Sequence, residues 1–341
     1  MRILVIGGTQ FIGPPIVKRL VASGHDVTVF HRGRTEGDLP PNVEHIHGDR
    51  EQLAEFAGEF RRLQPEVVLD MAAFTEQDAQ AVMRTFPGVA RRVVAISSQD
   101  VYRAYGRLHG TEPGSPEPVP FTEDAPLREK LFPYRGSGRN LDHYDKILVE
   151  RAVRSNPLLP GAVLRLPMVY GEGDNQHRLL TELKRMDDKR PAILLEERFA
   201  GWRWTRAYVE NVAAAIALAV NSESARTGTY NVGEADALSY ADWVREIARA
   251  AWWLGEVVIV PEDRLPPKLR PPAGDYRQDL VADTTRIRRE LGHMEPVSRF
   301  EALRRTVEWE RANRPEGAEK LFDYEAEDAV LAEVKQGDAR A

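Results

Sequence analysis

The sequence predicts an α/β fold in which helices cover both faces of a doubly wound parallel sheet, followed by a smaller C-terminal α/β lobe. The first observation is the start of the chain, where the mainly apolar run 2–6 leads through a glycine-containing turn into a stretch with helical spacing. The second is the recurrence of short apolar runs between helix-like stretches over the first half of the chain. Runs that are apolar throughout are typical of strands buried on both faces, so a parallel sheet is expected.

The turn after the first strand is expected to bind a dinucleotide. Gly7 lets the chain turn tightly at the strand end, and Gly13 lets the following helix lie close to the sheet. Pro14 and Pro15 fit the first turn of that helix, where a proline misses no hydrogen bond. The amino end of the helix carries unpaired N–H groups and a partial positive charge, which favours a pyrophosphate above the strand.

The other elements follow in order along the chain. Further strands are expected over residues 26–30, 43–46, 67–70, 92–96 and 162–166, and helices over residues 75–86, 141–153 and 206–220. Residues 106–139 are rich in proline, glycine and charge and are too long for a plain connection. They are therefore expected to form a loop over the site at the carboxyl ends of the strands.

Composition narrows the class of protein. The 341 residues are 29% charged and 42% apolar, as in ordinary globular proteins, and no run reaches the roughly 18 apolar residues of a membrane span. The lack of cysteine excludes disulfides and thiolate catalysis, and it suits a cytoplasmic enzyme without a signal peptide. The net charge of −6 argues against general nucleic-acid binding. The eight histidines show no pair at metal-ligand spacing, so no metal is expected.

Basic residues after the second strand favour NADP over NAD. NAD-binding proteins of this architecture carry an acidic residue at this strand end, which binds the ribose hydroxyls. Here the strand is followed by His31 and Arg32, with Arg34 close behind. A guanidinium can bind a 2′-phosphate through two hydrogen bonds, whereas a carboxylate would repel it. NADP is the favoured cofactor and NAD the alternative, and a solvated basic loop is the non-functional explanation.

The stretch Gly7-Gly8-Thr9-Gln10-Phe11-Ile12-Gly13 resembles the extended short-chain dehydrogenase/reductase family, the NAD-dependent epimerases and dehydratases of nucleotide sugars. Gly7 and Gly13 fit the family pattern G-x-x-G-x-x-G, in which Gln10 replaces the middle glycine. The stretch looks more like an atypical branch that includes chloroplast stem-loop RNA-binding proteins. The resemblance covers residues 1–312 and implies a Rossmann-type domain. Cofactor contacts are expected from Gly7, Thr9, Gln10, Phe11, Ile12, Gly13, His31, Arg32, Asp49, Ala72, Ala73, Lys146 and Pro167.

The resemblance also implies catalytic groups after the fifth strand and on a later helix. Ser98, four residues before Tyr102, matches the active-site Ser/Thr of the family. Lys146 matches the lysine of the signature Y-x-x-x-K, but the tyrosine position falls on Asp142. Tyr144 lies about 200° from Lys146 on a regular helix, so it could act only if the helix started late or bulged. The acid/base stays open between Asp142, Tyr144 and a loop tyrosine (Tyr102, Tyr105 or Tyr134), with Tyr144 preferred over Asp142.

Two arginines match substrate-binding positions of the family. Arg206 opens a stretch that resembles R-D-Y-I-H-V-x-D-V-A, in which the arginine grips the substrate diphosphate. Arg270 lies in a stretch that resembles a substrate-domain loop and is a second phosphate ligand in this interpretation. The expected domains are a dinucleotide-binding domain over 1–171 completed by segments near 206–233, an interwoven substrate lobe over 172–312, and an acidic helical tail over 313–341.

The leading hypothesis is an NAD(P)-dependent epimerase, dehydratase or reductase acting on a nucleotide-activated sugar, which implies hydride transfer between the nicotinamide and a sugar carbon. A homodimer is expected. The alternative is a dinucleotide-binding protein with reduced catalysis, for which the resemblance to the stem-loop branch implies an association with RNA. The altered tyrosine position favours this alternative, whereas Ser98, Lys146, Arg206 and the negative net charge disfavour it.

Overall fold

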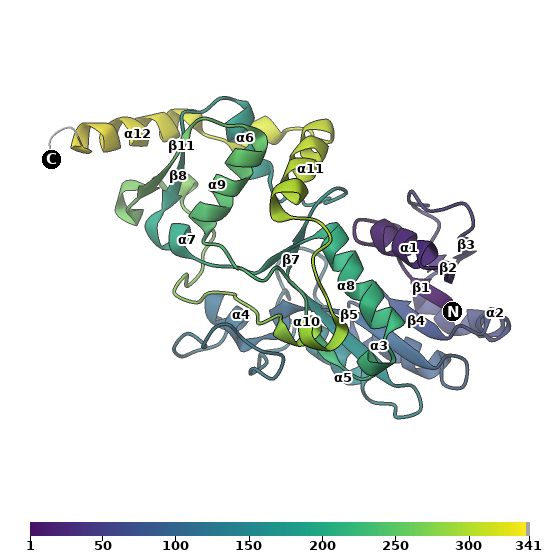
Figure 1. Cartoon of the computed structure of the whole chain (residues 1–341). Coiled ribbons are helices and arrows are strands. Elements are labelled where there is room, and N and C mark those ends of the chain that lie inside the picture. Colours follow the sequence, from purple (N-terminus) through teal and green to yellow (C-terminus); the bar gives the residue numbers. More distant parts are fainter. Residues whose placement is uncertain (339–341) are drawn as a thin grey trace.

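The computed structural model describes residues 1–338 and has a seven-stranded, fully parallel central sheet (Figure 1). Its strands are β1 (Arg2–Ile6), β2 (Asp26–His31), β3 (Glu44–His47), β4 (Val67–Asp70), β5 (Arg92–Ser98), β6 (Gly161–Leu166) and β10 (Thr229–Asn231). Their order is β3-β2-β1-β4-β5-β6-β10, so the chain reverses its direction of growth between β1 and β4. Open sheets bind ligands outside the carboxyl ends of the strands at such a point. The expected doubly wound sheet is confirmed.

Helices cover both faces of this sheet, and each face has its own buried cluster. One face carries α1 (Gly13–Ala22) and α8 (Val209–Asn221), and the other carries α2 (Ala57–Leu63), α3 (Glu76–Thr85) and α5 (Lys146–Val153). Ile16 and Ile216 are buried on the first face, where α1 contacts α8. Phe60 and Phe86 are buried on the second. The strands between them are apolar on both sides because neither face meets water.

A smaller lobe, drawn above the sheet in Figure 1, is built from later segments. Its elements are α6 (Leu180–Asp187), β8 (Ala192–Glu196), α7 (Glu197–Gly201), α9 (Tyr240–Ala251), β11 (Glu256–Val260) and α11 (Arg299–Ala312). β8 and β11 form a parallel pair. α9 contacts α6 and α11, and it buries Trp243, Val244 and Ile247 along one stripe. Between these segments the chain returns to the sheet in α8, in β10 and in α10 (Thr285–Leu291), which contacts β10.

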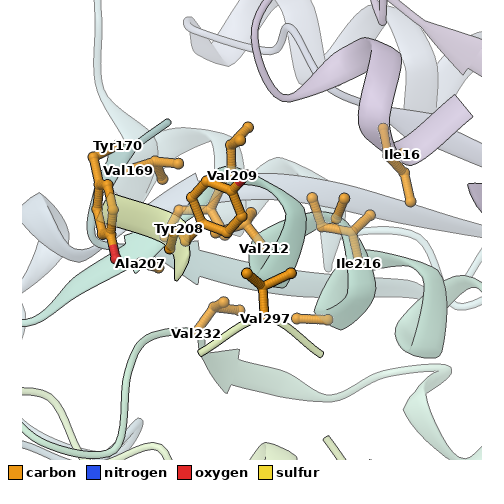
Figure 2. Close-up of a cluster of buried hydrophobic side chains, with 14 of the residues drawn as sticks. Ile16, Val169, Tyr170, Ala207, Tyr208, Val209, Val212, Ile216, Val232 and Val297 are labelled. Carbon is orange, nitrogen blue, oxygen red and sulfur yellow. The ribbon is translucent and has the colours of Figure 1, made fainter. Parts of the chain in front are cut away.

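A short parallel pair connects the two parts of the chain. It consists of β7 (Met168–Tyr170) and β9 (Arg206–Tyr208), with Met168 in register with Arg206. Figure 2 shows side chains of this pair, among them Tyr170 and Tyr208, packed with Val212 at the start of α8. The helix expected from residue 206 therefore begins only at Val209, and that expectation was wrong at its start. The backbone of 206–208 is held in the ladder with β7, which prevents helical hydrogen bonding there.

Shorter elements complete the fold. They are η1 (Arg50–Phe56), η2 (Gln99–Val101), α4 (Arg103–Leu108), η3 (Glu223–Ala225), η4 (Glu262–Arg264) and η5 (Pro267–Leu269). Between α4 and α5, residues 109–145 contain no named helix or strand. This loop returns to the carboxyl end of β5, where the Tyr134 hydroxyl donates to Asp100 Oδ2. Within residues 1–338, none of the helices combines the length and apolar composition needed to cross a bilayer.

The C-terminal segment folds back onto the lobe. It contains η6 (Ala318–Leu321) and α12 (Tyr324–Asp338), and the rest of the expected tail, residues 339–341, lies outside the described residues. Val330 packs against Val260 and Leu265 in a small buried cluster. Arg185 of α6 donates to the Glu327 carboxylate over 2.7 and 2.9 Å. The tail thus packs on the surface of its own chain.

Candidate functional site

The glycine turn between β1 and α1 has the tight geometry that its sequence suggests. Gly7 and Gly8 have φ of +91° and +89°, in the region where a side chain is strained. A Cβ at Gly13 would lie 2.3 Å from the Gly8 carbonyl carbon, so only glycine fits this approach of helix to turn. Gly8 was not singled out from the sequence, although a Cβ there would lie 2.8 Å from Val5. Two adjacent glycines after a buried strand were the available signal.

The amino end of α1 offers fewer amide donors than expected. Pro14 and Pro15 carry no N–H group, and the Gly13 N–H donates to the Gln10 carbonyl over 2.8 Å. Among the described residues, the amides of residues 8–12, just before the helix, donate no hydrogen bond to the chain. The expected helix-end site therefore depends on these amides together with the helix dipole.

The loop after β2 lies against this turn. The Thr35 hydroxyl is 3.0 Å from the Thr9 hydroxyl and 3.4 Å from Gln10 Nε2. Arg32 and Arg34, on the same loop, are exposed, and within residues 1–338 neither side chain has a hydrogen bond or ion pair. Both guanidinium groups are thus free to meet a ligand at this edge.

His31 and Asp49, expected at the adenosine side, both have protein partners. His31 Nε2 is 2.8 Å from His45 Nδ1, and its Nδ1 accepts the Gly33 N–H over 3.3 Å. Burial lowers the pKa of His31, and the nearby charge of Glu36 opposes this shift. Asp49 precedes η1 as its N-cap and accepts the amide of the second residue after it over 3.1 Å. A ribose contact by the His31 ring would require one of its two contacts to open.

A carboxylate at the end of β4 was missed by the sequence analysis. Asp70 is buried and accepts two hydrogen bonds from Arg50, each 3.1 Å long. It also accepts the Ala72 N–H over 3.1 Å, which fixes the backbone beside Gly7. A Cβ at Gly7 would lie 3.3 Å from the Ala72 side chain, so the ends of β1 and β4 approach closely. A buried aspartate directly after Val-Val-Leu was the signal for this group.

Lys146 is the first residue of α5 and is buried. Its Nζ donates to the carbonyls of Ala73, over 2.6 Å, and Ile96, over 2.9 Å. Among the contacts within residues 1–338, one of its three N–H donors is left for a ligand. Burial lowers the pKa of Lys146 to about 8, against the attraction of Asp70 and Asp100.

Tyr144 precedes α5, and its hydroxyl donates to Asp100 Oδ2 over 2.8 Å. Tyr134 donates to the same oxygen over 3.1 Å, and the Tyr105 hydroxyl lies 2.9 Å from that of Tyr134. Burial raises the pKa of Asp100. Burial and the charge of Asp100 also raise the pKa of Tyr144, which a hydrogen bond with the Ser98 side chain opposes. Ser98, Tyr144, Tyr134 and Tyr105 therefore meet around one buried carboxylate, Asp100, to which the sequence had not led us to assign a role.

The helix expected from residue 141 begins only at Lys146, and this corrects the geometry inferred from its spacing. Asp145 is the N-cap and accepts the Ile147 N–H over 2.8 Å. Its other carboxylate oxygen accepts the Phe132 N–H over 2.6 Å, which ties the loop to the helix start. Tyr144 is thus outside the helix, as its candidacy required. Asp142 is exposed and accepts the Gly136 N–H over 2.7 Å, so it does not share a helical face with Lys146.

Tyr102, one of the tyrosines considered as acid/base, binds side chains of the sheet strands β6 and β10. Its hydroxyl donates to Asn231 over 2.6 Å and accepts from Arg165 over 2.9 Å. Arg165 is in turn paired with buried Glu150 over 2.7 Å. Burial raises the pKa of Tyr102 to about 12.

The arrangement of Arg206 is unusual for a buried cation. Its guanidinium carbon lies 4.5 Å from the centroid of the Trp243 ring, and Nη1 donates to the Trp204 carbonyl over 3.1 Å. Within residues 1–338, its buried Nε and Nη2 have no hydrogen-bond partner. Burial lowers the pKa of Arg206 to about 10. Pro167 lies directly before β7, the strand that pairs with Arg206.

Arg270 lies in an acidic part of the lobe. Its Nε donates to the Leu265 carbonyl over 3.0 Å, and Nη1 is 3.9 Å from Glu262. The shallow cavity beside it, about 430 Å³, is lined by Glu196, Glu197, Arg198, Glu262, Asp263 and Arg270. Four carboxylates around two guanidinium groups disfavour a phosphate, so the geometry gives no support to Arg270 as a phosphate ligand.

Residues 3–233 match the model of the NAD dependent epimerase/dehydratase family, which is more than half of the chain. The chain belongs to this family. The assignment made from the sequence is confirmed, and with it the expectation of an enzyme, because the relatives of this epimerase/dehydratase family member include dehydratases, epimerases and reductases.

Several known proteins are similar to this family member. The 2'-dehydrokanamycin reductase of Streptomyces kanamyceticus is 28% identical over 66% of this chain and 60% of its own length, so the chain spans less than two thirds of that relative. The dTDP-glucose 4,6-dehydratase of Salmonella typhimurium is 26% identical over 92% of this chain and 93% of its own. A 41 kDa chloroplast stem-loop binding protein of Arabidopsis thaliana matches over 30% of each chain at 26% identity.

Among solved structures, the UDP-glucose 4-epimerase of Thermus thermophilus in complex with NAD superposes with a TM-score of 0.64. It is 24% identical over 91% of this chain and 99% of its own, which shows a shared fold. In the present family member a Cβ at Gly13 would overlap the Gly8 backbone, so the helix can approach the turn this closely only with glycine at this position.

Proposed function

We propose that this family member transforms a nucleotide-activated sugar with a nicotinamide dinucleotide, NADP being favoured over NAD. The observation that carries the proposal is the meeting of Ser98, Tyr144 and Lys146 at the carboxyl end of β5, next to the glycine turn. A hydroxyl, a phenol and a buried ammonium group together can bind and protonate a sugar oxygen beside a bound cofactor. The nicotinamide, when bound, supplies the redox chemistry.

In this proposal Lys146 orients the cofactor. Two of its N–H donors are bonded to the carbonyls of Ala73 and Ile96, which fixes the direction of the third. That donor binds a ribose hydroxyl. The positive charge of Lys146, buried near Asp100, also stabilises negative charge formed on the reacting oxygen.

Tyr144 and Asp100 act together as the acid/base in our proposal. The Tyr144 hydroxyl donates its proton in the hydrogen bond to Asp100 Oδ2. When the hydroxyl rotates toward the substrate oxygen, it can transfer this proton to that oxygen. Burial raises the pKa of Asp100, so this carboxyl group holds a proton at higher pH than an exposed aspartate would. Its other oxygen, Oδ1, has no partner within residues 1–338 and is a second acceptor for a substrate proton.

The nucleotide is bound through Arg206. A guanidinium buried with two unpartnered nitrogen atoms is costly, and a diphosphate would satisfy both donors with opposite charge. The dehydratase and epimerase relatives are named for dTDP-glucose and UDP-glucose, so sugar nucleotides of these two bases are the first to be tested. The preference for NADP rests on Arg32 and Arg34, which are exposed at the end of β2.

The test is a panel of dTDP-, UDP- and GDP-sugars, with binding measured by calorimetry and turnover by product analysis with NAD or NADP. Arg206→Ala should weaken binding of the sugar nucleotide and of free nucleoside diphosphate by about 1.5–3 kcal/mol, the range for charged hydrogen bonds. Arg91→Ala, which removes an arginine with an 80% exposed side chain, should leave binding unchanged.

Two outcomes would favour a different function. If every nucleoside diphosphate binds to Arg206→Ala as tightly as to the wild type, the arginine is structural and the proposed substrate class is wrong. If the protein binds a dinucleotide but turns over no sugar, the alternative of a binding protein with reduced catalysis is favoured, in line with the displaced tyrosine.

A further inference from the structure

A group of side chains at the edge of the sheet takes no part in the proposed reaction. His31 ends β2, His45 and His47 lie on the edge strand β3, and Glu36 comes from the loop between them. Alternate residues of a strand point to the same side, so His45 and His47 share a face. His31 is in register with His47 in the parallel ladder, which puts the third ring beside them. β2 and β3 lie at the margin of the molecule in Figure 1.

The ligand atoms of these four residues form a compact set. One atom from each lies within 4.8 Å of all the others. His31 Nε2 and His45 Nδ1 are 2.8 Å apart, and Glu36 Oε2 is 3.1 Å from His45 Nδ1 and 3.7 Å from His31 Nε2. Glu36 Oε1 is 3.2 Å from His47 Nε2.

These four separations, 2.8–3.7 Å, bracket those between ligands of a tetrahedral zinc ion. Zinc–nitrogen and zinc–oxygen bonds of about 2.0–2.2 Å put neighbouring ligands of a tetrahedron about 3.3–3.6 Å apart. We propose that His31, Glu36, His45 and His47 bind one Zn²⁺ ion at the edge of the sheet. Side-chain movements bring the ligand atoms, which now lie within 4.8 Å of one another, to these separations.

The donor set selects the kind of metal. Three imidazoles and one carboxylate are preferred by zinc and neighbouring transition metals, whereas magnesium and calcium prefer oxygen ligands. Four protein ligands leave no open position, which is typical of a structural zinc site. One ligand is held in place by burial, because the His31 side chain is only 5% exposed. The His47 side chain is 55% exposed, so an ion can reach the site from solvent.

Binding requires one local change. The Gly33 N–H now donates to His31 Nδ1 over 3.3 Å, so the neutral ring carries its proton on Nε2. Coordination through Nε2 moves this proton to Nδ1, and the long Gly33 contact opens. Zinc would then fasten the loop of Glu36 to β3, and the same loop contacts Thr9 and Gln10 of the glycine turn through Thr35.

This inference revises the expectation that no metal binds. That expectation considered only spacing along the chain and did not single out His45-Ile46-His47. On a strand the same spacing puts both rings on one side. The two further ligands come from separate segments and meet the pair only in the fold.

The experiment uses the full chain without an affinity tag, stripped of metal by a chelator, and titrated with Co²⁺ and then Zn²⁺ in the absence of nucleotide. We expect one equivalent of Co²⁺ to give the intense visible absorption of tetrahedral coordination, and one equivalent of Zn²⁺ to remove it. His45→Gln should lower the affinity by more than the roughly 10- to 100-fold that loss of an outer-shell partner costs.

One variant serves as a control and a second tests another ligand. His143→Gln removes an exposed histidine outside the cluster and should bind cobalt like the wild type. Glu36→Gln, on an exposed loop, should also weaken binding, and circular dichroism of each metal-free variant checks its fold. The proposal is overturned if cobalt gives only weak, octahedral-type absorption, or if His45→Gln and Glu36→Gln both bind as tightly as His143→Gln. Because nucleotide is absent, these results do not depend on the proposed enzymatic function.

Discussion

The two ends of the expected dinucleotide site are built in different ways. Around Tyr144 and Lys146 the polar groups are buried, and nearly every one is bonded to another part of the chain. Around Arg32 and Arg34, at the end of β2, the side chains are exposed, and the loop is held by contacts of Thr35 to the glycine turn and of Glu36 to the histidines of β2 and β3. Buried groups fix the position and pKa of their neighbours, whereas exposed groups act by charge and are screened by solvent. Substitutions at the first end should change the chemistry, and those at the second should change selectivity.

The largest effect is expected from Tyr144→Phe. The phenol is the proposed proton donor, and loss of a general acid costs roughly 10²- to 10⁴-fold in kcat. Tyr105→Phe is the matched control, because its hydroxyl contacts Tyr134 and lies one bond further from Asp100. Steady-state kinetics on a sugar nucleotide identified as substrate measure both. Equal losses of kcat in the two variants would mean that both tyrosines only support the fold. The buried end of the site would then not differ from the exposed end in controlling the chemistry.

Gly13→Val tests the backbone that both ends share. A side chain at residue 13 would overlap the Gly8 backbone, whose carbonyl carbon lies 2.3 Å from the added Cβ. We expect loss of dinucleotide binding together with a destabilisation of about 1–3 kcal/mol, as for other overpacked sites. Calorimetric titration and denaturant unfolding measure these. Gly58→Ala, on α2 with no atom nearer than 4.0 Å to its Cβ, should change neither. Wild-type affinity in Gly13→Val would remove the glycine turn from the site.

The charge of Lys146, at the buried end, is expected to make dinucleotide affinity depend on pH. Its pKa is lowered to about 8 by burial, from 10.5 in the unfolded chain, so the charge in the folded protein is lost as the pH rises through 8. Dinucleotide affinity should then fall about fivefold, since a charged hydrogen bond contributes roughly 1 kcal/mol more than a neutral one. Lys146→Gln should show a flat profile over the same range.

The sign of the stability effect is opposite. Between pH 8 and 10.5 the unfolded chain binds a proton at this lysine that the folded chain does not, so the contribution of Lys146 to stability rises with pH. Melting curves of wild type and Lys146→Gln over this range check it. If the wild type instead became less stable relative to Lys146→Gln as the pH rises, the lowered pKa of Lys146 would be contradicted.

The smallest effect is expected from Arg32→Asp at the exposed end. The guanidinium is solvated, and exposed charge pairs contribute about 0.2–1 kcal/mol, so the ratio of NADP to NAD affinity should fall by up to about fivefold. Arg61→Asp makes the same charge change on the exposed face of α2 and should leave the ratio unaltered. If the wild type binds NAD at least as tightly as NADP, the selectivity assigned to this end is wrong.

Several parts of the fold could be predicted from the sequence because they depend on local order. The strands β1 and β4 lie where their apolar runs indicated, and Pro14 and Pro15 occupy the first turn of α1. Gly7 takes a positive φ, as a tight turn after a buried strand requires. In each case the deciding interaction is between near neighbours in the chain, so spacing alone was enough to find it.

Tertiary contacts decided the rest. The start of α5 is set by Asp145, whose carboxylate caps the helix and also binds the backbone of residue 132, and this freed Tyr144 from helical geometry. β9 replaced the first turn of an expected helix because β7, far away in sequence, pairs with it. The histidine cluster needs two strands and a loop to form. The sequence by itself determined the glycine turn, the parallel sheet and the family. The side chains that meet at each end of the site were decided by segments that only folding brings together. The physical reason is that burial and strand pairing depend on spatial neighbours, which spacing along the chain does not reveal.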